Sequence, residues 1–167
     1  MTSQFEIKWL NFESKFSGRE REDVFEQLAY HLFCREFGLN KGLFRYKNQA
    51  GIETEPAIVD NEVIGFQAKY YDASINLSGK KGDLIDAIDK AKENNPALTK
   101  IIFYINKEFG ESSEKGKKEP DYKIEIEKKG TDCGVKVEWR VKSHLEIQLA
   151  QQNNKYVVLY IFYIFSR

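Results

Sequence analysis

The chain contains little cysteine and histidine, and it has no excess of charge of either sign. Its two cysteines, Cys34 and Cys133, are far apart and form no CxxC pair, which argues against a zinc site and fits a reducing compartment. Two histidines are too few for a His-rich metal centre. Lys plus Arg and Asp plus Glu both number 26, so any contact with phosphate has to come from a local basic patch.

Long apolar runs are also missing. No run reaches the roughly 18–20 apolar residues of a membrane span. The first residues, Met1 to Glu6, lack the charged and apolar regions of a signal peptide. We therefore expect a cytoplasmic protein with no membrane partner. Its 167 residues, of which 41% are hydrophobic, suffice for a single domain, 1–167, with a substantial core.

The spacing of apolar and turn-forming residues predicts an α/β fold in which helices and strands alternate. The first helix begins at the capping box Ser17-x-x-Glu20 and is ended by Gly38. The further predicted elements are a strand at 43–46, a hairpin of 57–59 and 63–71 with Asp60-Asn61 at its turn, a helix from about 84 to 95, a strand at 101–105, a loop at 107–120, a helix at 122–129, a strand at 135–140 and a helix at 143–151.

The segment Tyr156–Phe165 consists of ten apolar residues in a row. Its length and composition favour a last strand that is covered by the fold. A second interpretation is an exposed adhesive edge, through which the protein associates with itself or with a partner.

Three polar residues around one apolar strand suggest a chemical site. Strand alternation puts Gln67 and Lys69 on one face, and Glu53 lies a hairpin's length upstream. The Glu53 carboxylate, the Gln67 side-chain oxygen and the Ala68 backbone carbonyl are hard oxygen ligands suited to Mg²⁺, with Mn²⁺ as a substitute. Lys69 is suited to orient an attacking water and to offset charge on a phosphate. This arrangement predicts a nuclease, although a solvated Gln and Lys on a sheet face are common.

Two positions in this site remain open. A two-residue turn at Asp60-Asn61 puts Glu53 opposite Ala68, on the wrong face, so an irregularity or a bulge is needed to bring it to Gln67. Glu55 has the same side-chain parity and competes as the acidic ligand. Glu26 lies beside the apolar stripe of the first helix, where it either reaches the sheet edge as a further ligand or is simply solvated.

Glu26, Gly51-Ile52-Glu53 and Gly65-Phe66-Gln67-Ala68-Lys69-Tyr70-Tyr71 together resemble the PD-(D/E)XK nuclease superfamily. The branch they are most similar to is the Mrr-like restriction endonucleases, in which Q-x-K replaces (D/E)-x-K and which occur as N-terminal effectors of prokaryotic antiviral NTPases. The resemblance implies a mixed central sheet flanked by helices in the order αβββαβ. Its core covers about 17–105, and 106–167 form a C-terminal extension. The chain would then be a candidate for the N-terminal part of a larger protein.

The resemblance also implies Mg²⁺-dependent cleavage of DNA, with Glu53, Gln67 and Glu26 as metal ligands and Lys69 as the catalytic lysine. For contacts with nucleic acid we predict Lys80, Lys81 and Tyr71, and as weaker candidates Lys115, Lys117 and Lys118. Cleavage of both strands predicts a homo-oligomer, or activation by a fused or separate sensor domain. The alternatives are a catalytically silent nucleic-acid-binding module and a nuclease toxin that acts on RNA.

Overall fold

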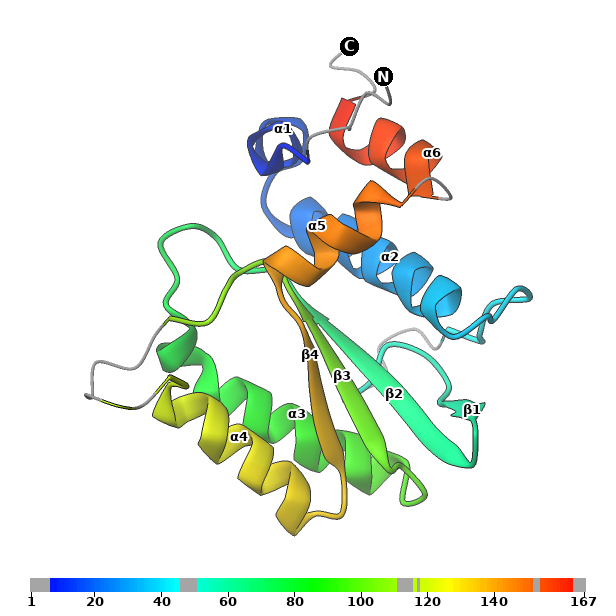
Figure 1. The fold of residues 1–167 in the computed structure, drawn as a ribbon, viewed down its shortest axis with the longest axis vertical. Helices are drawn as coiled ribbons and strands as arrows, with labels where there is room; N and C mark the ends of the chain where they lie inside the picture. The colour runs from blue at the N-terminus through cyan, green and yellow to red at the C-terminus, as the bar shows by residue number, and fades with distance from the viewer. Residues whose placement is uncertain (1–6, 46–50, 111–115, 117, 152–153, 164–167) are drawn as a thin grey trace.

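A computed structural model describes residues 7–45, 51–110, 116, 118–151 and 154–163. It shows a four-stranded mixed sheet in the order β1-β2-β3-β4, with helices on both faces (Figure 1). The predicted mixed α/β architecture is therefore confirmed. The elements are α1 (Trp9–Lys15), α2 (Arg19–Glu36), β1 (Ala57–Val59), β2 (Glu62–Lys69), η1 (Leu77–Lys80), α3 (Lys81–Asn94), β3 (Lys100–Ile105), α4 (Asp121–Asp132), β4 (Lys136–Arg140), α5 (Lys142–Ala150), α6 (Lys155–Val158) and η3 (Leu159–Tyr163).

The sheet begins with a tight antiparallel hairpin. Asp60 and Asn61 connect β1 to β2 with φ angles of 50° and 65°, values that Asp and Asn tolerate better than most residues. The remaining neighbours, β2 with β3 and β3 with β4, run parallel. Parallel strands require crossovers, and α3 and α4 supply them.

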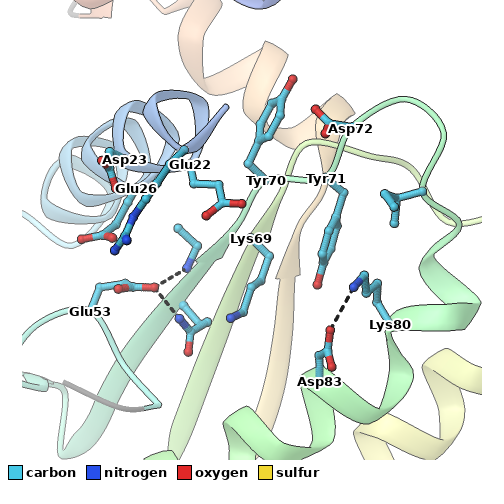
Figure 2. A pocket seen from close by; sticks show the side chains of 14 residues that line it. Glu22, Asp23, Glu26, Glu53, Lys69, Tyr70, Tyr71, Asp72, Lys80 and Asp83 are labelled. Atoms are coloured by element: carbon cyan, nitrogen blue, oxygen red, sulfur yellow. Dashed lines mark hydrogen bonds and ion pairs between the residues drawn. The ribbon is translucent and has the colours of Figure 1, made fainter. Parts of the chain in front are cut away.

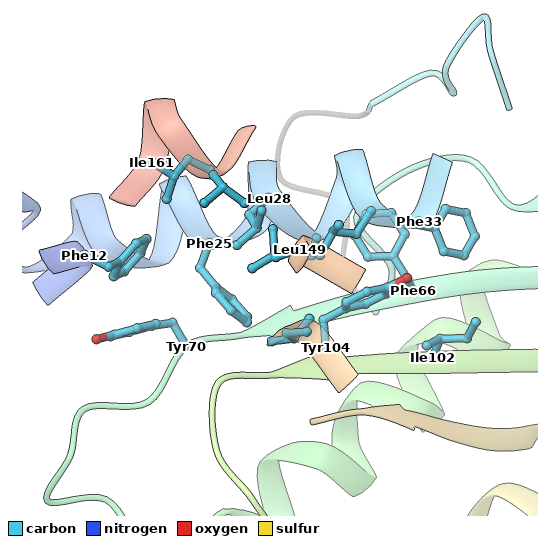
Figure 3. Close-up of a cluster of buried hydrophobic side chains, with 14 of the residues drawn as sticks. Phe12, Phe25, Leu28, Phe33, Phe66, Tyr70, Ile102, Tyr104, Leu149 and Ile161 are labelled. Carbon is cyan, nitrogen blue, oxygen red and sulfur yellow. The ribbon is translucent and has the colours of Figure 1, made fainter. Parts of the chain in front are cut away.

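Two apolar cores form because β3 is buried on both of its faces. Ile102 and Tyr104 point toward α2, α5 and the C-terminal helices, in the cluster drawn in Figure 3. Ile101 and Phe103 point toward α3 and α4 in the second cluster. This alternation follows directly from the period of two along a strand, and it makes β3 the central support of the sheet.

Two predictions near the N-terminus are wrong. Helix α2 begins at Arg19 with Gly18 as its N-cap, and only half of the capping box forms, as the Glu20 carboxylate accepts a hydrogen bond from the Ser17 amide at 3.4 Å. No strand forms at 43–45. The Phe44 carbonyl accepts a backbone hydrogen bond from the Glu55 amide at 2.8 Å, but this contact does not extend into a ladder of strand pairs. Tyr46, the last residue of that predicted strand, lies outside the described residues. Among the described residues, two strands rather than the predicted three therefore precede α3.

The predicted C-terminal strand is also wrong, because 155–163 is helical and forms α6 and η3. Ile161 and Phe162 follow Val158 by three and four residues, so one helical face buries all three against the core. Tyr156 and Tyr160 occupy the outer face and are exposed. Residues 164 and 165 of the predicted strand lie outside the described residues. An unbroken apolar run cannot distinguish a strand from a helix by its period, which explains the error.

The other elements lie close to their predicted positions. α4 is longer than predicted, and α1 was not predicted at all. In the predicted loop at 107–120, the described residues form neither helix nor strand. Across the described part of the chain, no helix combines the length and the apolar character that crossing a membrane requires.

Candidate functional site

A cavity of about 540 Å³ lies where β2 ends, between α2 and the start of α3 (Figure 2). The carboxyl end of a parallel strand is the usual place for a ligand in an α/β sheet. Six acidic and three basic residues line this cavity, so its own charge is negative. The lining residues are Arg19, Glu22, Asp23, Glu26, Glu53, Gln67, Ala68, Lys69, Tyr70, Tyr71, Asp72, Ile75, Lys80 and Asp83.

Glu53 reaches this cavity because the chain before β1 leaves strand geometry. The hairpin register, continued backward from Ala57, would place Glu53 opposite Ala68. Instead the Glu53 amide donates to the Phe66 carbonyl at 3.0 Å. Gly51 permits this path with a φ of 94°, packed so closely on α3 that a Cβ atom would lie 2.3 Å from the Ala91 nitrogen. The irregularity required by the sequence analysis is therefore present at 51–55.

The Glu53 carboxylate is tied to β2 by two hydrogen bonds. One of its oxygens accepts from the Ala68 amide at 3.1 Å and also from the Gln67 side-chain nitrogen (Figure 2). Burial raises the pKa of Glu53 to about 7, and the negative charge of Glu26 adds to the rise. The bond from Ala68, the Lys69 charge and the bond from Gln67 oppose it. Near neutral pH this carboxyl group is thus on the border between its charged and neutral forms.

Gln67 and Lys69 share one face of β2, as strand alternation predicts, and both line the cavity. Gln67 is only 9% exposed. The Lys69 side chain lies between Glu53 and Tyr71 in Figure 2. Its ammonium group has no hydrogen bond or ion pair to any residue that the structure describes. Lys69 is therefore available to contact an incoming group.

Glu26 points from α2 into the same cavity and forms an ion pair with Arg45. Arg45 in turn lies over the Tyr30 ring, 5.2 Å from its centroid. Glu55 is excluded from the cavity, because one of its carboxylate oxygens accepts a hydrogen bond from the Phe44 amide at 3.0 Å. Of the two competing carboxylates, the structure brings Glu53 to Gln67 and Lys69.

Only some of the residues predicted to contact nucleic acid lie at the cavity. Tyr71 and Lys80 line the cavity, whereas Lys81 forms an ion pair with Glu125 of α4 at 2.5 Å and does not line it. Lys118 is exposed outside the cavity. Lys115 and Lys117 lie outside the described residues.

Sequence reasoning missed part of the acidic lining. Glu22 and Asp23 lie one turn before Glu26 on α2, so helical spacing from Glu26 could have found them. Asp83, in the first turn of α3, forms an ion pair with Lys80 at 3.2 Å. Asp72, just beyond β2, pairs with Arg21 at the same distance. These residues make the cavity far more acidic than the motif alone suggested.

The oxygen atoms around Glu53 are of the kind that a hard divalent cation prefers. The oxygen atoms that could bind such a cation belong to the carboxylates of Glu53 and Glu26, the Gln67 side-chain amide and the Ala68 carbonyl. In the described ranges no three His, Cys, Asp or Glu side chains gather as a metal-binding group, so neutral oxygens and water would have to complete the coordination. Gln67 turns its nitrogen toward Glu53, and its amide has to rotate to offer its oxygen. The excess of negative charge supports a cation here.

In comparisons with known proteins, no family model matches the chain and no curated protein matches it significantly. The geometry and chemistry of the cavity are therefore the basis for assigning a function.

Proposed function

We propose that the protein is a Mg²⁺-dependent endonuclease that hydrolyses DNA, built on a restriction-endonuclease-like core of the PD-(D/E)XK type. One observation carries this proposal: Glu53, Gln67 and Lys69 meet in a cavity at the end of β2, and Glu26 joins them from α2. The Lys69 ammonium has no hydrogen bond or ion pair to any of the described residues. The mixed sheet with helices on both faces is compatible with such a core. The part of the chain that the structure describes has two strands before α3 in place of three, which is a departure from the order αβββαβ.

In the proposed reaction, Glu53, Gln67, the Ala68 carbonyl and Glu26 would hold Mg²⁺. When bound, this ion would acidify a water molecule and reduce the charge on the phosphate. Lys69 would orient the attacking water and stabilise the negative charge that builds up on the phosphate oxygens. Attack on phosphorus forms one P–O bond and breaks the bond to the 3′ oxygen, which takes up the proton of the water. The products are a 5′-phosphate and a 3′-hydroxyl.

The charge of the cavity suggests how activity would be controlled. Six acidic residues against three basic ones repel a nucleic-acid backbone, so the single chain would bind DNA weakly. We propose that assembly into an oligomer, or a sensor domain or partner, raises the local concentration of sites and switches cleavage on, as in an antiviral defence effector. Efficient cleavage by a monomer would refute this control.

A catalytically silent nucleic-acid-binding module is the second candidate. It is favoured by the bond from the Gln67 nitrogen to Glu53, which occupies the carboxylate that would bind metal. It is also favoured by the absence, within the described residues, of three clustered acidic, His or Cys ligands. The two candidates differ in what Lys69→Ala does: a silent module would keep its biological effect, whereas a nuclease would lose it.

A plasmid-nicking assay tests the proposal. Wild type, Lys69→Ala and the surface control Lys128→Ala are compared with Mg²⁺, with Mn²⁺ and with EDTA, over a range of protein concentrations. Lys128 suits this purpose because it is 72% exposed on α4, outside the cavity. We expect metal-dependent nicking by wild type and the control, and none by Lys69→Ala. Equal nicking by Lys69→Ala would exclude the proposed role, and a parallel RNA digest identifies the substrate.

A further inference from the structure

Tyr71 carries a buried hydroxyl group that has no hydrogen-bond partner among the described residues. The residue is 8% exposed and packs in the cluster beside α3. Its backbone is held on both sides by Asn106, which accepts from the Tyr71 amide and donates to the Tyr71 carbonyl, each at 2.8 Å. These two bonds fix the Tyr71 backbone just beyond the end of β2. An unpaired buried hydroxyl is costly, and a ligand that pairs with it would remove this cost.

The tip of Tyr71 lies beside the ion pair of Lys80 and Asp83 (Figure 2). The Lys80 ammonium is 3.2 Å from the Asp83 carboxylate and 5.9 Å from the centroid of the Tyr71 ring. The two paired side chains are 33% and 61% exposed, so water screens their attraction and the pair opens readily. Burial and the charge of Asp83 raise the pKa of the Tyr71 hydroxyl, which therefore keeps its proton and remains a donor.

The donors at this end of the cavity match an anion with several oxygens. Lys69 and Tyr71 are two residues apart and both line the cavity, as does Lys80. Two ammonium groups and one phenol together present positive charge and hydrogen atoms to the same space. A phosphate in a nucleic-acid backbone accepts from donors of both kinds. Asp83 is the one acidic group in the cavity that is ion-paired to Lys80.

We propose that Tyr71 and Lys80 form a subsite for a backbone phosphate of DNA, and that Asp83 competes with this phosphate for Lys80. In the bound state Lys80 leaves Asp83 and contacts the phosphate, which also accepts the hydrogen bond of Tyr71. The identity of the ligand as DNA rests on the proposed function. The subsite itself needs neither the metal nor cleavage.

DNA binding is therefore measured with EDTA present, by fluorescence anisotropy of a labelled duplex titrated with the full chain. Tyr71→Phe should weaken binding about tenfold, which corresponds to the loss of one hydrogen bond to a charged group. Lys80→Gln should weaken binding and lower the slope of log K against log salt by about one. Asp83→Asn should tighten binding several-fold because it releases Lys80. The control Lys128→Gln removes one positive charge outside the cavity and should leave affinity unchanged.

The opposite signs of these effects separate binding from folding, because general damage to the fold cannot tighten binding in Asp83→Asn. Unchanged affinity in Tyr71→Phe, affinity in Asp83→Asn no higher than wild type, or no DNA binding by wild type overturns the subsite. Nicking by wild type with unchanged binding by Tyr71→Phe would refute the subsite and leave the nuclease in place. The expected binding pattern without nicking would support the subsite and refute the nuclease.

Discussion

Replacement of Glu53 by glutamine should stabilise the protein at neutral and alkaline pH. The folded protein raises the pKa of this carboxyl group from 4.5 to about 7. This difference corresponds to roughly 3 kcal/mol that the charged carboxylate costs the native state. Glutamine has no charge, and its side-chain oxygen can still accept from the Ala68 amide. We therefore expect Glu53→Gln to gain up to about 3 kcal/mol, or at most roughly 6–12 °C in Tm for a chain of this size.

The gain should depend on pH in a defined direction. Because the pKa of Glu53 is higher in the folded than in the unfolded chain, the native state binds more protons between pH 4.5 and about 7. The contribution of Glu53 to stability is thus complete below the lower value and is lost as the pH rises through the upper one. Urea unfolding of wild type and Glu53→Gln should give the full difference at about pH 8 and almost none at about pH 4.

Two additions make this measurement decisive. Glu93→Gln replaces an exposed carboxylate of α3 and serves as the control, unfolded in urea at the same two pH values. Added Mg²⁺ should stabilise wild type at about pH 8 and have little effect on Glu53→Gln, because a ligand that binds only the native state stabilises it. If Glu53→Gln is only as stable as wild type at about pH 8, or less stable, then the charged Glu53 carboxylate does not destabilise the native state.

Two further comparisons test the surroundings of the site. Tyr71→Phe should leave stability unchanged or raise it by about 1 kcal/mol, because its buried hydroxyl has no partner among the described residues. Tyr30→Phe should lose about 1–2 kcal/mol, because the Tyr30 hydroxyl bonds both the amide and the carbonyl of Leu43. Thermal unfolding of the two variants checks this order of stability, and the reverse order would contradict it. Gly51→Ala should lower the free energy of unfolding in urea by roughly 2–4 kcal/mol, because its φ is positive and its Cβ would collide with the backbone of α3. Gly82→Ala, which has open space in the first turn of α3, should leave stability unchanged or raise it. Equal effects of the two substitutions would refute the close approach of Gly51 to α3.

Elements whose signal is local were predictable. Asp60-Asn61 between two apolar runs indicated the hairpin, because the two-residue turn needs positive φ angles that Asp and Asn tolerate. The spacing of Leu84, Ile88 and Ala91 likewise indicated α3. The run 156–165 carried no period. Its helix packs in one apolar cluster with α5 and with α1 and α2, and the residues of α1 and α2 are more than a hundred positions away. Its helical state was therefore a result of packing.

In the candidate site, too, some features followed from the local sequence and others from tertiary packing. Alternation along β2 alone determined that Gln67 and Lys69 share a face, since neighbouring side chains on a strand point to opposite sides. Only the tertiary structure decided that Glu53 joins them, because its position depends on Gly51 packing against α3 and on a bond to Phe66. The pKa of Glu53 and the unpaired hydroxyl of Tyr71 were likewise hidden. Burial and the approach of distant charges are set when segments remote in sequence pack together, and no local pattern of residues contains them.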